Sequence, residues 1–231
     1  MTKGKLIVID GIDGSGKATQ IKLLKTRLKK EKIKVKTIDF PRYQDNFFGK
    51  LIGKYLSGIY GDFIKVAPRL ASVLYAADRF ESSQQIQNWL NLGFIVLADR
   101  YATANQIHQG GKISNLKERK DFLKWLDTME YEIFKIPKPD LVIYLDLPLE
   151  VSKMWLMNKV AQRKKTYLKS RKDVAEDNLI HLKNSRDSAI LLQKQNKNWK
   201  KVTCCAGMVC MSPTEVHEEV LKIVLKKLND S

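Results

Sequence analysis

The stretch "LIVIDGIDGSGKATQ", residues 6–20, decides the fold. It opens with four apolar residues, which predict a buried strand, and Gly11, Gly16 and Lys17 then match the spacing G-x-x-x-x-G-K. An amphipathic helical pattern follows, so the glycines connect a strand to a helix. There, converging backbone N–H groups and the helix N-terminus can bind phosphate oxygens, and Lys17 can neutralise a phosphoryl group. We therefore predict a phosphate-binding loop formed by Gly11, Ile12, Asp13, Gly14, Ser15, Gly16, Lys17, Ala18 and Thr19.

The residue after the loop lysine is unusual. Such loops ordinarily continue with Ser or Thr, whose hydroxyl binds magnesium, but this chain has Ala18, and Thr19 comes one position later. One residue turns a side chain by about 100° around a helix, so Thr19 should not replace the missing ligand. We expect Mg²⁺ to be held mainly by ATP oxygens, water and a carboxylate, either Asp99, directly or through water, or Asp10.

Short aliphatic runs recur along the chain with helical patterns between them. Runs that are apolar on both faces and alternate with helices predict a parallel sheet covered on both sides, the doubly wound α/β class, with its active site at the carboxyl ends of the strands. Acidic residues follow three of the runs, as Asp10, Asp99 and Asp146, although any one of them alone could be an ordinary turn residue. The five expected strands are Leu6–Ile9, Val35–Ile38, Phe94–Leu97, Leu141–Leu145 and Val202–Cys204.

The length of 231 residues suggests a single domain over residues 1–231. The apolar run near the start is too short for a signal peptide or a membrane span, so we expect a cytoplasmic protein that does not contact a membrane. At the other end, Ser212, Pro213 and Glu215 have the spacing of a capping box that starts a closing helix. The three cysteines have no zinc-site spacing, and we expect them to be reduced and structural, with a metal site as the lesser alternative.

The formal net charge of +17 is compatible with a polyanionic partner or with a lysine-rich solvated surface. Much of this charge lies in "KLLKTRLKKEKIKVK" and in "KVAQRKKTYLKSRKD". The first run has apolar residues at helical spacing with lysines between them, which indicates a solvated helix face.

Four further motifs follow the loop in order: "DFPRY" at 39–43, "LYAADRFE" at 74–81, "DRYATANQIHQGG" at 99–111 and "YLDLP" at 144–148. Together with "GIDGSGKAT" they resemble the thymidylate kinase family. The resemblance implies a P-loop kinase with a five-stranded parallel sheet flanked by helices and a mobile basic lid over about residues 158–175. It also implies ATP and Mg²⁺, conversion of dTMP to dTDP in dTTP biosynthesis, and a homodimer.

The resemblance further implies roles for residues of these motifs. Asp13 approaches the sugar hydroxyl, an aromatic ring and an arginine of the "DFPRY" segment meet the base and the acceptor phosphate, and Tyr75 and Arg79 bind thymine from one helix face. Arg100 clamps phosphate bidentately, which suits its planar guanidinium, and Asp99 organises magnesium or water. The expected dTMP-binding residues are Asp13, Phe40, Arg42, Tyr43, Tyr75, Arg79, Arg100, Asn105 and Gln106.

Two positions depart from the family pattern. Some members carry a catalytic arginine in the loop where this chain has Gly14, so the charge must come from elsewhere. We expect it from the basic segment at Gln162–Asp173, with Arg163 and Arg171 as candidates. His108 stands where many relatives have tyrosine, and we assign it no catalytic role. The expected catalytic residues are Lys17, Asp99, Arg100, Arg163 and Arg171.

Other interpretations remain open at this point. A kinase for another nucleoside monophosphate or for a deoxynucleoside would share the fold and the loop. A basic P-loop protein that binds nucleotides or nucleic acid without catalysis is less favoured, and we do not expect a nucleic-acid partner; it would show strongly salt-dependent binding to nucleic acid.

Overall fold

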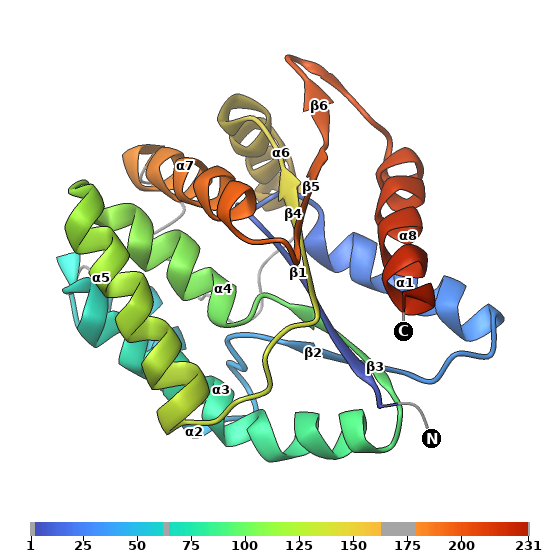
Figure 1. The fold of residues 1–231 in the computed structure, drawn as a ribbon. Helices are drawn as coiled ribbons and strands as arrows, with labels where there is room; N and C mark the ends of the chain where they lie inside the picture. Colours follow the sequence, from blue (N-terminus) through green and yellow to red (C-terminus); the bar gives the residue numbers. More distant parts are fainter. Residues whose placement is uncertain (1–2, 62–64, 163–178, 231) are drawn as a thin grey trace.

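The structure is a computed structural model that describes residues 3–61, 65–162 and 179–230. Five parallel strands form its central sheet in the order β2-β3-β1-β4-β5 (Figure 1). All five lie at or within a few residues of the positions expected from sequence, and the doubly wound class is confirmed. The strands are β1 (Lys5–Gly11), β2 (Val35–Asp39), β3 (Ile95–Asp99), β4 (Leu141–Asp146) and β5 (Trp199–Thr203).

Helices cover both faces of the sheet (Figure 1). The short π-helices η2 (Asn105–Gln109) and η4 (Thr128–Ile133) and the 3₁₀ turn η3 (Gly110–Lys112) lie between the α-helices. The α-helices are α1 (Lys17–Lys30), α2 (Phe47–Leu56), α3 (Pro68–Asn91), α4 (Ala102–Ala104), α5 (Leu116–Asp127), α6 (Leu149–Gln162), α7 (Leu179–Gln195) and α8 (Pro213–Asn229).

The strands alternate between two hydrophobic cores because successive side chains point to opposite faces of a sheet. In β1, Ile7 and Ile9 pack with the buried residues of α1 and α8, whereas Leu6 and Val8 pack with those of α3 and α7. Both sets are fully buried. This two-sided burial explains why the strands read as continuous apolar runs, and β1 lies at the centre of the strand order.

Helix α8 begins as its sequence predicts. The Ser212 hydroxyl accepts a hydrogen bond from the backbone N–H of Glu215, and the Glu215 carboxylate accepts one from the Ser212 N–H, which completes a capping box. Pro213 occupies the first turn, where its missing N–H has no helical partner to lose.

The cysteines differ from the expectation that all three are reduced. After β5 the chain forms a small antiparallel hairpin of β6 (Cys205–Ala206) and β7 (Val209–Cys210), and its register sets Cys205 opposite Cys210. These two residues are joined by a disulfide, while Cys204 is free and buried. The sequence pattern missed the hairpin because the two strands are only two residues long.

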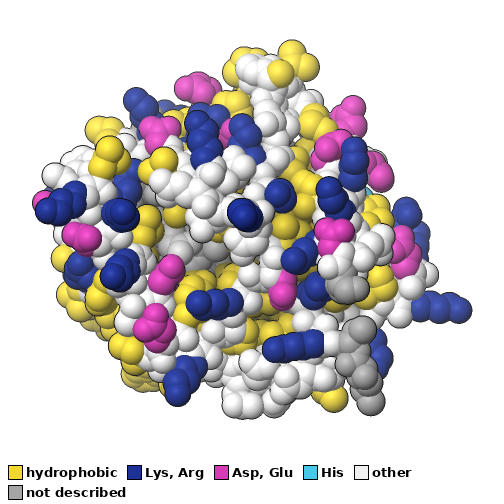
Figure 2. All heavy atoms as spheres, viewed as in Figure 1, with side chains coloured by type: hydrophobic (Ala, Val, Ile, Leu, Met, Phe, Trp, Pro, Cys, Tyr) yellow, Lys and Arg dark blue, Asp and Glu magenta, His cyan; other side chains and the backbone are white. Residues whose placement is uncertain are grey.

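The basic residues do not gather in one patch on the face shown in Figure 2, where Lys and Arg are spread over the surface with Asp and Glu among them. Helix α1 has the predicted solvated face, since most of its lysines are exposed while Leu24 and Leu28 are buried. Within the described ranges, no helix is long and apolar enough to cross a membrane.

Candidate active site

The carboxyl ends of the parallel strands meet at one edge of the sheet. There the register sets Asp99, the last residue of β3, beside Ile9 of β1 and beside Asp39 of β2. A cavity of about 560 Å³ opens at this edge, lined by the loop after β1, the segments after β2 and β3, and residues of α2, α3, η2 and α7. This is the position at which doubly wound sheets bind ligands.

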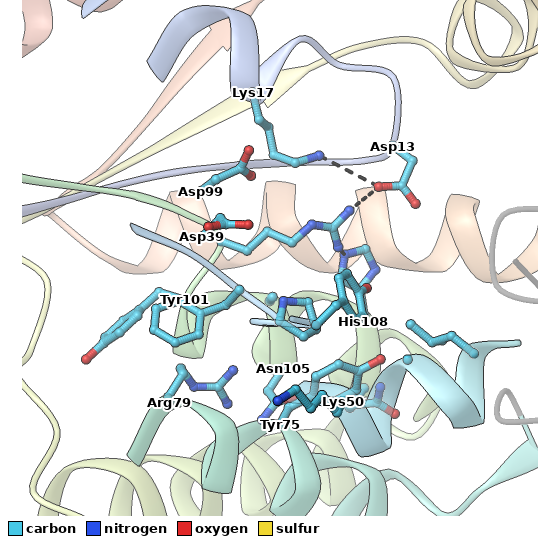
Figure 3. A pocket seen from close by; sticks show the side chains of 18 of the residues that line it. Asp13, Lys17, Asp39, Lys50, Tyr75, Arg79, Asp99, Tyr101, Asn105 and His108 are labelled. Atoms are coloured by element: carbon cyan, nitrogen blue, oxygen red, sulfur yellow. Dashed lines mark hydrogen bonds and ion pairs between the residues drawn. The ribbon is translucent and has the colours of Figure 1, made fainter. Parts of the chain in front are cut away.

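The two ends of the cavity differ in chemistry, as Figure 3 shows. Asp13 and Lys17 of the glycine-rich loop lie at one end, while Tyr75, Arg79 and Asn105 lie at the other. Lys17 suits an anionic group such as phosphate, and the second set suits a flat polar ring such as a nucleobase. One open space therefore joins the two kinds of site.

The loop has the conformation that phosphate binding requires. Gly16 has a φ of 90°, which only glycine adopts without strain, and α1 begins directly after it. The buried Ser15 hydroxyl has no hydrogen-bond partner among the described residues, so it is available to a ligand oxygen. Ala18 and Thr19 are both exposed and do not line the cavity.

Lys17 is held inside the loop. Its ammonium donates hydrogen bonds to the carbonyl oxygens of Gly11 and Ile12 at 3.0 and 3.1 Å and lies 3.8 Å from the Asp13 carboxylate. Burial lowers the pKa of Lys17, and Arg100 acts in the same direction, while Asp13 opposes them. A buried cation with these few partners is suited to receive a more strongly charged anion.

Two carboxylates were expected as magnesium ligands, and their surroundings differ. Asp99 lines the cavity beside Lys17, and burial raises the pKa of its carboxyl. Asp10 is fully buried outside the cavity lining, and its oxygens accept hydrogen bonds from the Gly11 N–H and the Thr103 hydroxyl at 2.8 and 2.7 Å. Asp10 therefore supports the loop, and the structure does not favour it as a metal ligand.

The protein by itself offers a metal few ligands. Within the described part of the chain, no group of three or more His, Cys, Asp or Glu side chains could hold an ion. One carboxylate beside a phosphate-binding loop does fit Mg²⁺, because this ion keeps several waters and binds substrate phosphates.

Arg100 is fixed between two partners. Its backbone has a φ of 62° and its N–H donates to the Ile9 carbonyl oxygen at 3.1 Å. Its guanidinium forms an ion pair with Asp13 and contacts the His108 ring at 3.0 Å. Burial opposes its charge, but Asp13 raises the pKa of Arg100 above its already high ordinary value.

The "DFPRY" segment divides between the cavity and the surface. Phe40 and Tyr43 line the cavity, and the buried Phe40 packs against Tyr101 with ring centroids 5.7 Å apart. Arg42, which was expected at the acceptor phosphate, is absent from the lining. Its guanidinium is instead bound to Asp45 and to side chains of α3.

Helix α3 places Tyr75 and Arg79 in the cavity as the four-residue spacing predicts. Arg79 is paired with the buried Glu130 of η4, a partner that the sequence did not reveal. Asn105 also lines the cavity and donates to Glu130 at 3.2 Å and to the Ser72 carbonyl oxygen at 3.1 Å. Since Glu130 is 51 residues from Arg79 in the chain, no local pattern could have connected them.

Gln106 lies elsewhere than expected. Its side chain donates to Asp127 at 3.1 Å and is not part of the cavity lining, because η2 turns it away from the cavity. The neighbouring Gln109 does line the cavity, as do Lys50, Lys54 and His181, none of which was predicted. The spacing of Lys50 and Lys54 was the available signal, since residues four apart share a helix face. Arg163 and Arg171 lie outside the described residues.

Comparisons with known proteins agree on one family. The family model described as "Thymidylate kinase" matches residues 9–206. The "Thymidylate kinase" of Plasmodium falciparum is 34% identical over 146 residues, which cover 63% of each chain. The "Probable thymidylate kinase" of Pyrococcus abyssi is 31% identical over 230 residues, which cover 98% of each chain. A solved thymidylate kinase from Candida albicans superposes with a TM-score of 0.71 at 26% identity, covering 99% of this chain and 94% of the other.

Proposed function

The chain belongs to the thymidylate kinase family, and on this basis we propose that it transfers the γ-phosphoryl group of ATP to dTMP, giving ADP and dTDP. The observation that carries the proposal is that residues of the phosphate loop line one end of a cavity whose other end is lined by Tyr75 and Arg79. A phosphoryl donor and a nucleotide acceptor can lie in it with their phosphates adjacent.

The donor ATP binds at the loop end. Backbone N–H groups of the loop and the N-terminus of α1 bind its phosphates, and Lys17 leaves the loop carbonyls to neutralise the transferred group. Asp99 would hold Mg²⁺ directly or through water, with ATP oxygens as further ligands. Magnesium, when bound, neutralises charge on the β- and γ-phosphates.

The acceptor dTMP occupies the rest of the cavity. Tyr75 and Phe40 supply aromatic faces for the base, and Arg79, which also lines the cavity, donates to a base carbonyl. Arg100 binds the acceptor phosphate, and Asp13, its ion-pair partner, accepts a hydrogen bond from the sugar hydroxyl. Arg42 is given no direct contact with the acceptor, because its guanidinium lies outside the cavity lining.

The reaction needs no strong base, because a phosphate oxygen of dTMP is already a nucleophile. Catalysis then consists of aligning the two phosphates and compensating the charge of the transferred group, which Lys17 and Arg100 do and to which a bound magnesium ion would add. With Gly14 in the loop, the remaining positive charge comes from Arg163 or Arg171 of the basic segment.

A homodimer is part of the proposal. Helix α3 exposes Leu70, Val73 and Phe80 with 61, 38 and 51% of their surfaces accessible, at spacings that put them on one side of the helix. An apolar stripe of this kind is suited to contact a second copy. Light scattering coupled to gel filtration measures the mass directly; a monomer at micromolar concentration would contradict this part.

A coupled assay of ADP release tests which acceptor the protein phosphorylates. We expect dTMP to give the highest kcat/KM among dTMP, dUMP, dGMP and thymidine. Faster turnover of another monophosphate would move the assignment to a related kinase, and faster turnover of thymidine to a deoxynucleoside kinase. Slow ATP turnover that no acceptor stimulates, together with salt-sensitive binding to DNA or RNA, would favour a nucleotide-dependent binding protein instead.

A further inference from the structure

His108 on η2 connects the phosphate-end arginine to helix α7. Its Nε2 lies 3.0 Å from Nη1 of Arg100, and its Nδ1 lies 3.1 Å from the hydroxyl of Ser185 on α7. Ser185 is completely buried, and the His108 ring also lies near the ring of His181, with centroids 5.8 Å apart. The imidazole is therefore an intermediate link in a chain of polar contacts between two parts of the cavity wall.

The hydrogen-bond partners determine which ring nitrogen carries the proton. Ser185 donates its only hydroxyl hydrogen to the His181 carbonyl oxygen at 2.8 Å, so towards His108 it can only accept. Nδ1 of His108 must then be protonated, and Nε2 keeps the lone pair that accepts from Arg100. Arginine offers only donors, so this contact requires a neutral imidazole.

The charges around His108 favour the same neutral form. Burial lowers the pKa of His108 well below its ordinary value, and Arg100, His181 and Lys17 lower it further, while Asp13 opposes them. Among the described residues, these four titratable groups have the largest effect on the ring. Protonation of His108 would put a second positive charge beside the guanidinium of Arg100 in a buried place, which is costly.

Two partners hold the guanidinium of Arg100. Asp13 binds Nη2 and His108 accepts from Nη1, while the left-handed backbone of Arg100 aims the side chain at the cavity. An arginine fixed in this way has little rotamer freedom left to lose when an acceptor phosphate binds.

Helix α7 packs tightly enough to fix the position of Ser185. A Cβ atom at Gly111 would lie 2.9 Å from the carbonyl carbon of Asn184 and 3.0 Å from the backbone nitrogen of Ser185. Gly111, three residues after His108, thus lets α7 approach η3 closely. The contact from Ser185 to His108 rests on backbone packing rather than on a flexible side chain.

We propose that His108 is a positioning residue that acts through Arg100: as a neutral acceptor anchored to Ser185, it holds the guanidinium in the orientation that binds the acceptor phosphate. This inference rests on the proposed function. The ring need not touch the substrate, and its imidazole takes no proton during the reaction.

Two amide variants separate this role from a general packing role. In His108→Gln the amide oxygen can reach the position of Nε2 and accept from Arg100, whereas in His108→Asn the shorter amide cannot. We expect His108→Asn to lower kcat/KM for dTMP by about tenfold or more and His108→Gln by less than about threefold, with the KM for ATP unchanged in both. Equal losses of kcat/KM for dTMP in the two variants, or a changed KM for ATP, would overturn the proposal.

Helix α7 provides a matched pair of serines. Ser188 is also buried, and its hydroxyl donates to the Gln106 carbonyl oxygen at 3.2 Å, but it takes no part in the contacts to Arg100. Ser185→Ala should reduce kcat/KM for dTMP several-fold, while Ser188→Ala should leave it unchanged. A larger loss of kcat/KM in Ser188→Ala than in Ser185→Ala would contradict the role of Ser185 in holding His108.

A ligand-free measurement distinguishes failure of this inference from failure of the proposed function. Long-range ¹H–¹⁵N NMR of the wild-type protein should show His108 as the neutral tautomer protonated at Nδ1, and it should stay neutral at pH 5.5. The opposite tautomer or a charged ring would refute the arrangement even if the wild type phosphorylates dTMP. If the tautomer is found but wild-type turnover with dTMP is absent, the proposed function fails and the proposal about the acceptor phosphate falls with it.

Discussion

Arg79 of α3 and Glu130 of η4 form an ion pair in which each side chain is only 2% exposed. The contact is bidentate, with Nε of Arg79 donating to Oε2 at 3.1 Å and Nη2 donating to Oε1. Asn105 donates to the same carboxylate. One buried acid therefore orients two side chains that line the base end of the cavity.

Glu130→Gln should both destabilise the protein and weaken dTMP binding. Removing one partner of a buried ion pair leaves an uncompensated charge, which costs about 3–5 kcal/mol. The amide can still accept one hydrogen bond, so the KM for dTMP should rise more than kcat falls. Urea unfolding and steady-state kinetics measure the two effects. Glu132→Gln, at an exposed position two residues away, should change stability by less than about 0.5 kcal/mol; equal effects of the two substitutions would contradict the assigned role of Glu130.

Ala18→Ser and Asp99→Asn test where the magnesium ligand lies. Ala18 is exposed outside the cavity lining, whereas Asp99 lines the cavity beside Lys17. Restoring the hydroxyl should leave kcat within about tenfold of the wild type, while the neutral Asn should reduce it severely. Magnesium titration of kcat gives the measurement. The reverse order of effects would show that Asp99 is not the ligand.

Stability should fall between pH 6.5 and about 4, in part because His181 is held neutral. Burial lowers the pKa of His181 to about 4, and Lys112 acts in the same direction. In this window the unfolded chain binds a proton that the folded chain does not, so the free energy of unfolding drops by about 1.4 kcal/mol per pH unit for this group.

Carboxyls with raised pKa values, such as Asp78 and Asp99, act in the opposite direction, so the comparison with a variant isolates the histidine. Urea unfolding at pH 7.5 and pH 5 gives, for the wild type and for His181→Gln, the change in the free energy of unfolding between the two pH values. We expect the variant to lose less stability than the wild type on acidification. Equal losses in the two proteins would contradict a depressed pKa at His181.

Arg163→Ala and Arg171→Ala test the source of the charge that the loop lacks. With Gly14 in the loop, one of these arginines should compensate charge in the transition state, so at least one variant should lower kcat far more than it raises the KM for dTMP. Steady-state kinetics of both single variants decide this. Near-normal turnover in both would remove the assignment to the basic segment.

The fold could be predicted from the sequence because its signals are local. Aliphatic runs of four or five residues mark the strands, and the glycine spacing before Lys17 marks the first strand-to-helix turn. The motifs also placed Tyr75, Arg79, Asp99 and Arg100 at the cavity, where the structure has them.

What the sequence missed depends on contacts between distant residues. The side chain of Arg42 is bound by residues of α3, and the partner of Arg79 comes from η4, neither of which a local pattern can specify. Gln106 is turned away by a π-helix, a rare geometry that no periodicity predicts. The reduced state expected of Cys205 was wrong because the hairpin that pairs it was too short to recognise.

The most direct test of the proposed function is identification of the product. Purified protein is incubated with ATP, Mg²⁺ and dTMP, and the nucleotides are separated by anion-exchange chromatography. We predict that dTDP forms in equal amount to ADP and that Lys17→Ala abolishes both. ADP that appears with inorganic phosphate and without dTDP would contradict the account.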